Sequence, residues 1–194
     1  MMKNIVFQSV VSLIGFSSCL FAAGVAVDTG QTVCYNEAGT VISCPNPGMA
    51  LAQDGTYQSG TRQGFAVLNL VGVSSVTVAS HTGLIWITNP VDAGIGGGYS
   101  WVNAIAACEN LNYSGYGDWR LPNVRELMSL VNRQNQNPAV GVAYFMNTQN
   151  GYYWSSTTYV AGDTLAWYVD FSVGNVNATP KTYLGWVRCV RGGL

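Results

Sequence analysis

The chain has 194 residues, which is enough for one domain with a hydrophobic core. Hydrophobic residues make up 48% of it, and this composition excludes a disordered polar chain. Charged residues make up only 9% and the net charge is −1, which argues against nucleic acid or an anionic membrane as the main partner.

The first residues have the layout of a secretory signal peptide, which we assign to residues 1–23. Lys3 carries the only early positive charge, an apolar run covers residues 5–21, and small residues at 22–24 offer a cleavage site. The run is short and interrupted, so we expect no transmembrane segment here, nor in any later stretch. The alternatives are an ordinary buried helix and a lipid anchor on Cys19. We expect the protein outside the cytoplasm, whether secreted, on the cell surface or in the periplasm.

Beyond the signal peptide there are four cysteines: Cys34, Cys44, Cys108 and Cys189. An even number in an exported chain indicates two disulfides, for which three pairings exist. Cys34 and Cys44 flank a sequence typical of a hairpin turn at 37–40, so a local bridge is the economical choice. Cys108 and Cys189 would then form the second bridge, which would stabilise the fold by roughly 4 kcal/mol in the chain-entropy model. Zinc is the competing use, but the spacing contains no C-x-x-C pair.

Residues 24–64 are rich in Gly, Thr, Gln, Asn and Pro, and this composition predicts an extended segment held by the local disulfide. The folded domain is expected over residues 65–194. It begins with three β-rich stretches, at 67–73, 76–78 and 84–87. The glycine-rich segment at 94–98 lacks the Lys-Ser/Thr of a phosphate-binding loop, so we interpret it as a connection.

Two helices are predicted next. The first begins at Ser100, a favourable N-cap, and runs to about Asn110. One apolar stripe recurs along it at helical spacing: Trp101, Ala104, Ile105, Cys108 and Leu111. The second helix begins at Asn123, and Glu126 three residues later completes a capping box. Its apolar face would consist of Val124, Leu127, Met128 and Val131.

The remainder is predicted to be β-structure. Three runs, at 152–159, 164–171 and 183–190, are separated by turns at 161–163 and 174–177. In the middle run, Trp167, Val169 and Phe171 are predicted to face the core. The opposite face would carry Ala166, Tyr168 and Asp170. Two helices followed by an antiparallel sheet define an α+β fold.

A set of spaced motifs resembles one known family. Gly117-Asp118-Trp119-Arg120-Leu121-Pro122, followed by Glu126-Leu127, resembles the G-x-W-R-L-P-x-x-x-E-L signature of the bacterial Lcl C-terminal domain family. Further motifs follow in the family's order: Tyr153-Trp154-Ser155-Ser156, Ala166-Trp167-Tyr168-Val169 and Val187-Arg188-Cys189-Val190-Arg191. The resemblance covers residues 80–194.

This resemblance implies a C-type-lectin-like fold, in which a disulfide commonly ties the first helix to the last strand. A Cys108–Cys189 pairing agrees with that expectation. The namesake domain of the family ends a collagen-like surface adhesin and recognises sulfated glycosaminoglycans. This chain has no collagen repeat and is slightly acidic, which argues against a sulfated ligand.

Few residues suggest catalysis or metal binding. The single histidine, His81, lies in a loop, and the nine carboxylates are scattered without a close pair. No motif supplies a nucleophile with a positioned base. The segment 170–177 contains one carboxylate, too few for a calcium site. We therefore expect no enzyme activity, no catalytic residue, no metal ion and no cofactor.

Four arginines could either support the fold or bind a ligand: Arg120, Arg125, Arg188 and Arg191. Buried hydrogen-bond networks are the simpler interpretation for Arg120 and Arg188, and a sulfate-binding patch is the alternative.

Tyrosine and tryptophan crowd the chain after residue 150, and their rigid rings suit a binding surface. Those residues expected to reach solvent, on the outer strand face or in loops, are the predicted ligand-binding residues: Tyr168, Asp170, Asn175, Asn177 and Tyr183. The sequence thus predicts an adhesin or lectin-like recognition module that binds a glycan or protein. The alternative is a structural subunit of a surface assembly or fibre, and self-association into a homo-oligomer is left open.

Overall fold

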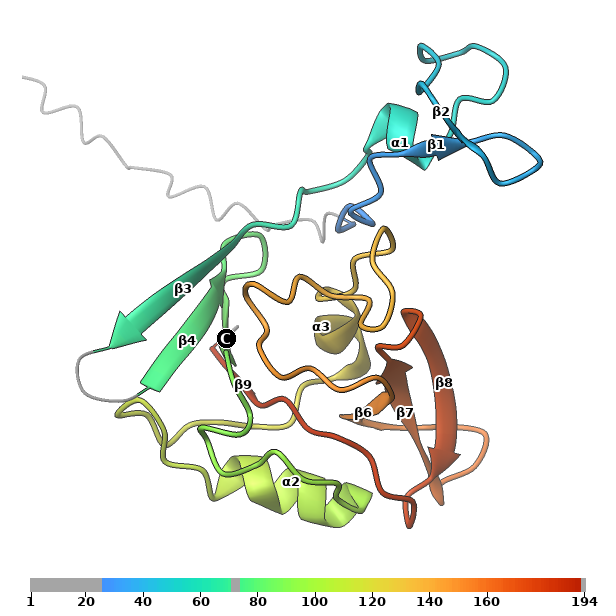
Figure 1. Cartoon of the computed structure of the whole chain (residues 1–194). Helices are drawn as coiled ribbons and strands as arrows, with labels where there is room; N and C mark the ends of the chain where they lie inside the picture. Colours follow the sequence, from blue (N-terminus) through green and yellow to red (C-terminus); the bar gives the residue numbers. More distant parts are fainter. Residues whose placement is uncertain (1–25, 71–73, 193–194) are drawn as a thin grey trace, which may run out of the picture.

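The computed structural model describes residues 26–70 and 74–192 (Figure 1). The predicted signal peptide with Cys19, and the end of the first β-rich stretch at 71–73, lie outside the described residues. Over the part described, no helix is both long and apolar enough to cross a membrane. The described chain is α+β, with antiparallel sheets, three small helices and two disulfides.

Residues 26–64 form a small lobe that projects from the larger body of the chain (Figure 1). It contains strands β1 (Cys34–Tyr35) and β2 (Val41–Ile42) and the short helix α1 (Asp54–Tyr57). The predicted hairpin at 37–40 is confirmed, because β1 and β2 pair on either side of it. Asn36 closes this turn, since its side-chain oxygen accepts hydrogen bonds from two backbone N–H groups of the turn. The sequence did not predict α1.

The larger body begins with a four-stranded antiparallel sheet. Its strands, in spatial order, are β3 (Phe65–Leu70), β4 (Ser74–Ala79), β5 (Leu84–Ile87) and β9 (Val190–Arg191). The strands predicted at 76–78 and 84–87 are confirmed. Strand β9 places the end of the chain beside the start of the domain, because Trp86 of β5 pairs with Val190.

Helices α2 (Trp101–Glu109) and α3 (Val124–Met128) begin where the sequence predicts. Ser100 precedes α2 with an extended backbone, although its side chain makes no capping hydrogen bond. Asn123 and Glu126 form the predicted capping box of α3, each side chain accepting from the backbone N–H of the other. The prediction for Met128 is wrong: this side chain is 40% exposed, because α3 ends there and of its residues only Leu127 is buried.

The predicted disulfides are confirmed. Cys34 is bonded to Cys44 in the small lobe, and Cys108 to Cys189 in the larger body. Cys108 lies on the apolar stripe of α2 and is fully buried, as is Cys189 just before β9. The second bridge therefore ties the first long helix to the last strand.

A separate three-stranded antiparallel sheet completes the body. Its strands are β6 (Tyr152–Thr158), β7 (Leu165–Asp170) and β8 (Asn175–Pro180), in that order. The turn predicted at 174–177 is wrong beyond Gly174, because Asn175 already pairs with Asp170 and begins β8. Asparagine is tolerated there because β8 is the edge of the sheet and Asn175 and Asn177 are exposed.

The last predicted strand, at 183–190, is also largely wrong. Only Val190 belongs to a strand, and the residues before it make single bridges to different neighbours, such as Gly185 to Tyr99 and Trp186 to Tyr153. The segment runs from the three-stranded to the four-stranded sheet, so it cannot pair continuously with either.

Two clusters of buried side chains draw on both sheets, one also on α2 and the other on α3. The face assignment within β7 is therefore partly wrong. Val169 belongs to the cluster near α3 as predicted, but Trp167 is only half-buried. Ala166, predicted on the outer face, is fully buried in the cluster near α2, and Tyr168 packs against that cluster. Strand β7 has buried residues on both faces, Ala166 on one and Val169 on the other, which an alternation pattern alone cannot reveal.

Candidate functional site

Four of the five predicted ligand-binding residues lie together on one face of the three-stranded sheet. Residues directly opposite each other in paired strands share a face. The register places Asp170 opposite both Tyr152 and Asn175, and Tyr168 opposite Asn177. We call this set the polar aromatic face: Tyr152, Tyr168, Asp170, Asn175 and Asn177. Tyr152 is the member that the sequence did not single out.

The two tyrosines of this face form an aromatic pair. The ring centroids of Tyr152 and Tyr168 are 5.0 Å apart, with an angle of 52° between the ring planes. Burial raises the pKa of Tyr168, and the nearby Asp170 carboxylate and Tyr152 raise it further. The Tyr168 hydroxyl is therefore protonated at neutral pH and can both donate and accept a hydrogen bond.

Trp154 supports the tyrosine pair from the same face. Its indole Nε1 donates to the carbonyl oxygen of Tyr99 at 2.8 Å, and its ring lies 6.3 Å from that of Tyr152. Gly185 allows this packing: a Cβ there would come within 2.9 Å of the Trp154 Nε1 and 3.1 Å of Tyr152. Any larger residue at position 185 would displace the aromatic rings.

The polar members of the face keep free hydrogen-bonding groups. Asp170 accepts from the N–H of Ser172 through Oδ1, and the structure gives its Oδ2 no partner among the described residues. The Asn177 Oδ1 accepts from the N–H of Ala178, which leaves its amide donors available. Asn175 is exposed and its side chain makes no hydrogen bond within the described chain. The arrangement can therefore both donate to and accept from a polar ligand.

Tyr183, the fifth predicted residue, is not placed on this face by the strand register. It follows β8 in the turn where its N–H donates to the carbonyl of Pro180, and its side chain is 55% exposed. It belongs to no strand, so the register does not place it on the polar aromatic face.

Three of the four predicted arginines support the fold. Arg188 is fully buried and donates to the carbonyls of Ile87, Thr88 and Met146 and to the Thr148 hydroxyl, at 2.6–3.2 Å. Burial lowers its pKa to about 10, so it is still cationic at neutral pH. Arg120 forms a two-point ion pair with Glu126, and Arg191 pairs with Asp118.

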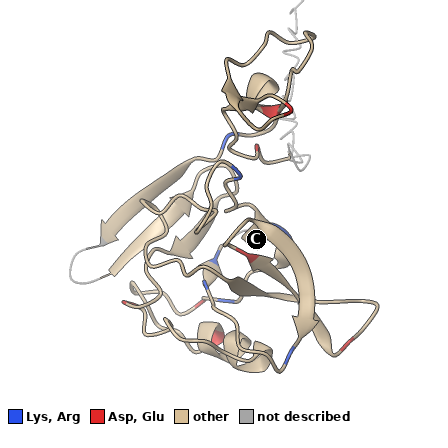
Figure 2. Ribbon diagram, turned by 45° about the vertical axis from the view of Figure 1, so that its right-hand side comes forward, with Lys and Arg blue, Asp and Glu red and all other residues tan. Residues whose placement is uncertain are grey.

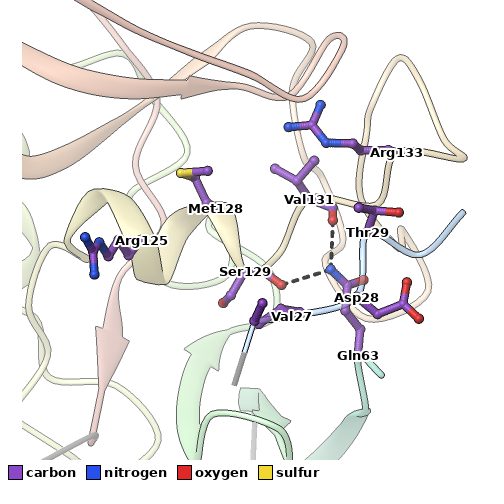
Figure 3. A pocket seen from close by; sticks show the side chains of 10 residues that line it. Val27, Asp28, Thr29, Gln63, Arg125, Met128, Ser129, Val131 and Arg133 are labelled. Carbon is purple, nitrogen blue, oxygen red and sulfur yellow. Dashed lines mark hydrogen bonds between the residues drawn. The ribbon is translucent and has the colours of Figure 1, made fainter. Parts of the chain in front are cut away.

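The fourth, Arg125, lines a cavity of about 540 Å³ between the small lobe and the residues of α3 and just after it (Figure 3). Val27, Met128 and Val131 give the cavity an apolar wall, and Arg133 lies at its other side (Figure 3). No pattern in the sequence points to this cavity, because its two walls come from segments about 100 residues apart.

Gln63 joins these two walls. Its side-chain amide donates to the carbonyls of Ser129 and Val131, at 3.0 and 2.7 Å (Figure 3).

His81 is engaged in packing. Its Nδ1 lies 3.2 Å from the backbone nitrogen of Gly64, and its ring meets Phe65 edge-on at 5.1 Å. Within the described ranges, no three His, Cys, Asp or Glu side chains are grouped so that they could hold a metal ion.

One family model matches the chain, described as the Lcl C-terminal domain, over residues 75–191. The match begins within β4 and spans β5, α2, α3, the whole polar aromatic face and β9, while β3 lies before it. No curated protein matches the sequence.

Proposed function

We propose, given that the chain belongs to the Lcl C-terminal domain family, that it is an exported, non-enzymatic recognition module with a C-type-lectin-like fold. It binds a glycan or a protein ligand, as an adhesin or lectin-like protein does. The ligand lies on the polar aromatic face.

The gathering of Tyr152, Tyr168, Asp170, Asn175 and Asn177 on one sheet face is the observation that supports this proposal. Tyrosine rings offer a rigid apolar surface at low entropic cost, which suits the carbon–hydrogen faces of a sugar or an apolar side chain. The carboxylate and amides beside them can bond hydroxyl or peptide groups. An uncharged, hydroxyl-rich ligand fits this face best, because no cation belongs to it.

Export is supported by the two disulfides, which persist in oxidising compartments. The predicted signal peptide would deliver the chain there. A binding function without catalysis is favoured because His81 packs against Phe65, and Glu126 and Asp118 are occupied by arginines.

Substitutions on the polar aromatic face test the proposal. We expect Asn175→Ala and Tyr168→Phe each to weaken binding about tenfold or more, because each removes a hydrogen-bonding group from the site. The melting temperature should change by no more than about 2 °C, since Asn175 is exposed and Phe keeps the Tyr168 ring. Binding is measured on a glycan array and on immobilised extracellular matrix proteins.

Tyr183→Ala is the matched control, because Tyr183 is an exposed tyrosine that the strand register does not place on the face. Unchanged binding in this variant, with loss in the other two, locates the site. If binding survived both face substitutions, the polar aromatic face would not be the recognition surface.

A further inference from the structure

Strand β3 is a sheet edge without the usual protection against pairing. It forms one side of the four-stranded sheet and pairs only with β4 (Figure 1). Its residues, Phe65 to Leu70, include no charge and no proline, and Leu68 is 46% exposed. Figure 2 shows no charged residue on β3 or β4. Natural proteins usually blunt such an edge with lysine, proline or a bulge.

The other outer edges of the four-stranded and three-stranded sheets are covered or blocked. On β8, Pro180 has no backbone N–H, and the N–H of Ala178 already donates to the Asn177 side-chain oxygen. Strand β9 is covered by Arg120, which exchanges backbone hydrogen bonds with Val190. On β6, the backbone N–H of Trp154 donates to the carbonyl of Trp186. Among the outer edges of these two sheets, the open edge of β3 is therefore the exception.

The pairing of β3 with β4 fixes which groups point outward. The Ser80 N–H donates to the carbonyl of Gly64, so Gly64 directs its backbone toward β4. Backbone direction alternates along an antiparallel strand, so Phe65, Val67 and Asn69 direct their N–H and C=O groups to the outer edge. No hydrogen bond reaches these groups from any residue that the structure describes.

We propose that β3 pairs antiparallel with β3 of a second copy of this chain, about a two-fold axis at Val67. In this register Val67 lies opposite Val67 of the second copy, and Phe65 lies opposite Asn69. Every outward-directed residue then exchanges both of its backbone hydrogen bonds, and the two sheets become one continuous sheet. This inference goes beyond the proposed function and does not depend on it.

The side chains of the strand are complementary to their own copy in this register. On the face carrying Leu68, each Leu68 lies opposite Ala66 of the second copy, so an exposed large side chain meets an exposed small one. The β-branched pair at Val67 is favourable across strands. Because the strand is uncharged, two copies do not repel each other, which is why a second copy is the occupant that fits.

Val67→Pro tests the pairing. Its N–H points away from β4, so proline removes an intermolecular donor while leaving the internal ladder intact. In light scattering coupled to size exclusion over a concentration series, we expect the full chain to reach dimer mass. The variant should stay monomeric, or dissociate at a concentration at least about tenfold higher. Far-UV circular dichroism and the melting temperature verify that it is folded.

A charge-swap series tests the register itself. Ala66→Lys and Leu68→Glu should each weaken the dimer, because each replaces an apolar contact with a charge. The double variant A66K/L68E should restore it, because each new lysine then lies opposite a glutamate of the second copy.

Each possible result decides between this pairing and its alternatives. A full chain that remains monomeric at every concentration overturns the proposal, as does a folded Val67→Pro variant that dimerises as tightly as the parent chain. Failure of the double variant to recover overturns the register centred on Val67.

Discussion

At the residue scale, Glu126 joins the start of α3 to the end of the chain. Its Oε2 accepts from the Asn123 N–H at 2.8 Å, and both carboxylate oxygens accept from the Arg120 guanidinium. Arg120 also donates to the carbonyl of Gly192. One carboxylate therefore holds both the helix cap and the arginine that contacts the last described residue.

The environment of Glu126 makes this contact dependent on pH. Burial by itself would raise the pKa of Glu126, but the hydrogen bonds from Arg120 and the Asn123 backbone and the Arg120 charge outweigh it, and its pKa is lowered. A carboxyl whose pKa is lower in the folded than in the unfolded state stabilises the fold when the pH is above its ordinary pKa of 4.5. That stabilisation is lost as the pH falls through the folded pKa.

We therefore expect Glu126→Gln to lower the free energy of unfolding by about 1 kcal/mol at pH 7, because glutamine keeps the cap but loses the ion pair. The difference from the parent chain should shrink as the pH falls below 4.5. Urea unfolding at several pH values measures it. Glu109→Gln, at an exposed position without an ion pair among the described residues, is the control. A difference that is constant with pH would contradict this account.

At the scale of elements, the bridge between α2 and the residue before β9 joins segments that are 81 residues apart. Both sulfurs lie in the buried cluster near α2. The Cys34–Cys44 bridge spans only 10 residues and lies in the small lobe. The two disulfides should therefore differ in how much they stabilise the chain, because a longer closed loop removes more entropy from the unfolded state.

We expect the double variant C108A/C189A to lose about 4 kcal/mol of unfolding free energy, and C34A/C44A to lose less, about 2–3 kcal/mol. Equilibrium urea unfolding of the two double variants and the parent chain measures both values. A larger loss in C34A/C44A would show that the small lobe, and not the α2 bridge, controls global stability.

At the scale of the whole molecule, the small lobe contributes nothing to the two buried clusters, whose members all come from residue 65 onward. It contacts the body through a few hydrogen bonds, such as that from the Arg133 N–H to the carbonyl of Thr29, and through Gln63. It also forms one wall of the cavity in Figure 3. The lobe is therefore an attachment to a body that has its own core.

We expect a chain that starts at Gln63 to fold with both buried clusters intact, with a melting temperature a few degrees lower, by about 2–5 °C. Keeping Gln63 preserves its bonds to the carbonyls after α3. Near-UV circular dichroism, which reports the packing of the tryptophans, measures the fold. An unfolded product would mean that the domain boundary at residue 65 is wrong.

Features that depend on local chemistry could be predicted from the amino-acid sequence alone. The capping box at Asn123, the apolar stripe of α2 and the Cys34–Cys44 hairpin all arise between residues close in the chain, and each is found in the structure. The spaced motifs also identified the family, since several motifs in order are more specific than any one of them.

Features that depend on distant segments could be seen only in the folded chain. Alternation could not show that β7 has buried residues on both faces, so Ala166 and Trp167 were misplaced. The asparagines after Gly174 favour a turn locally, yet pairing with β7 makes them a strand, and that same pairing brings Asn175 and Asn177 beside Tyr152 and Tyr168. Which residues share a face is set by register between strands, and register is fixed only when both partners are present.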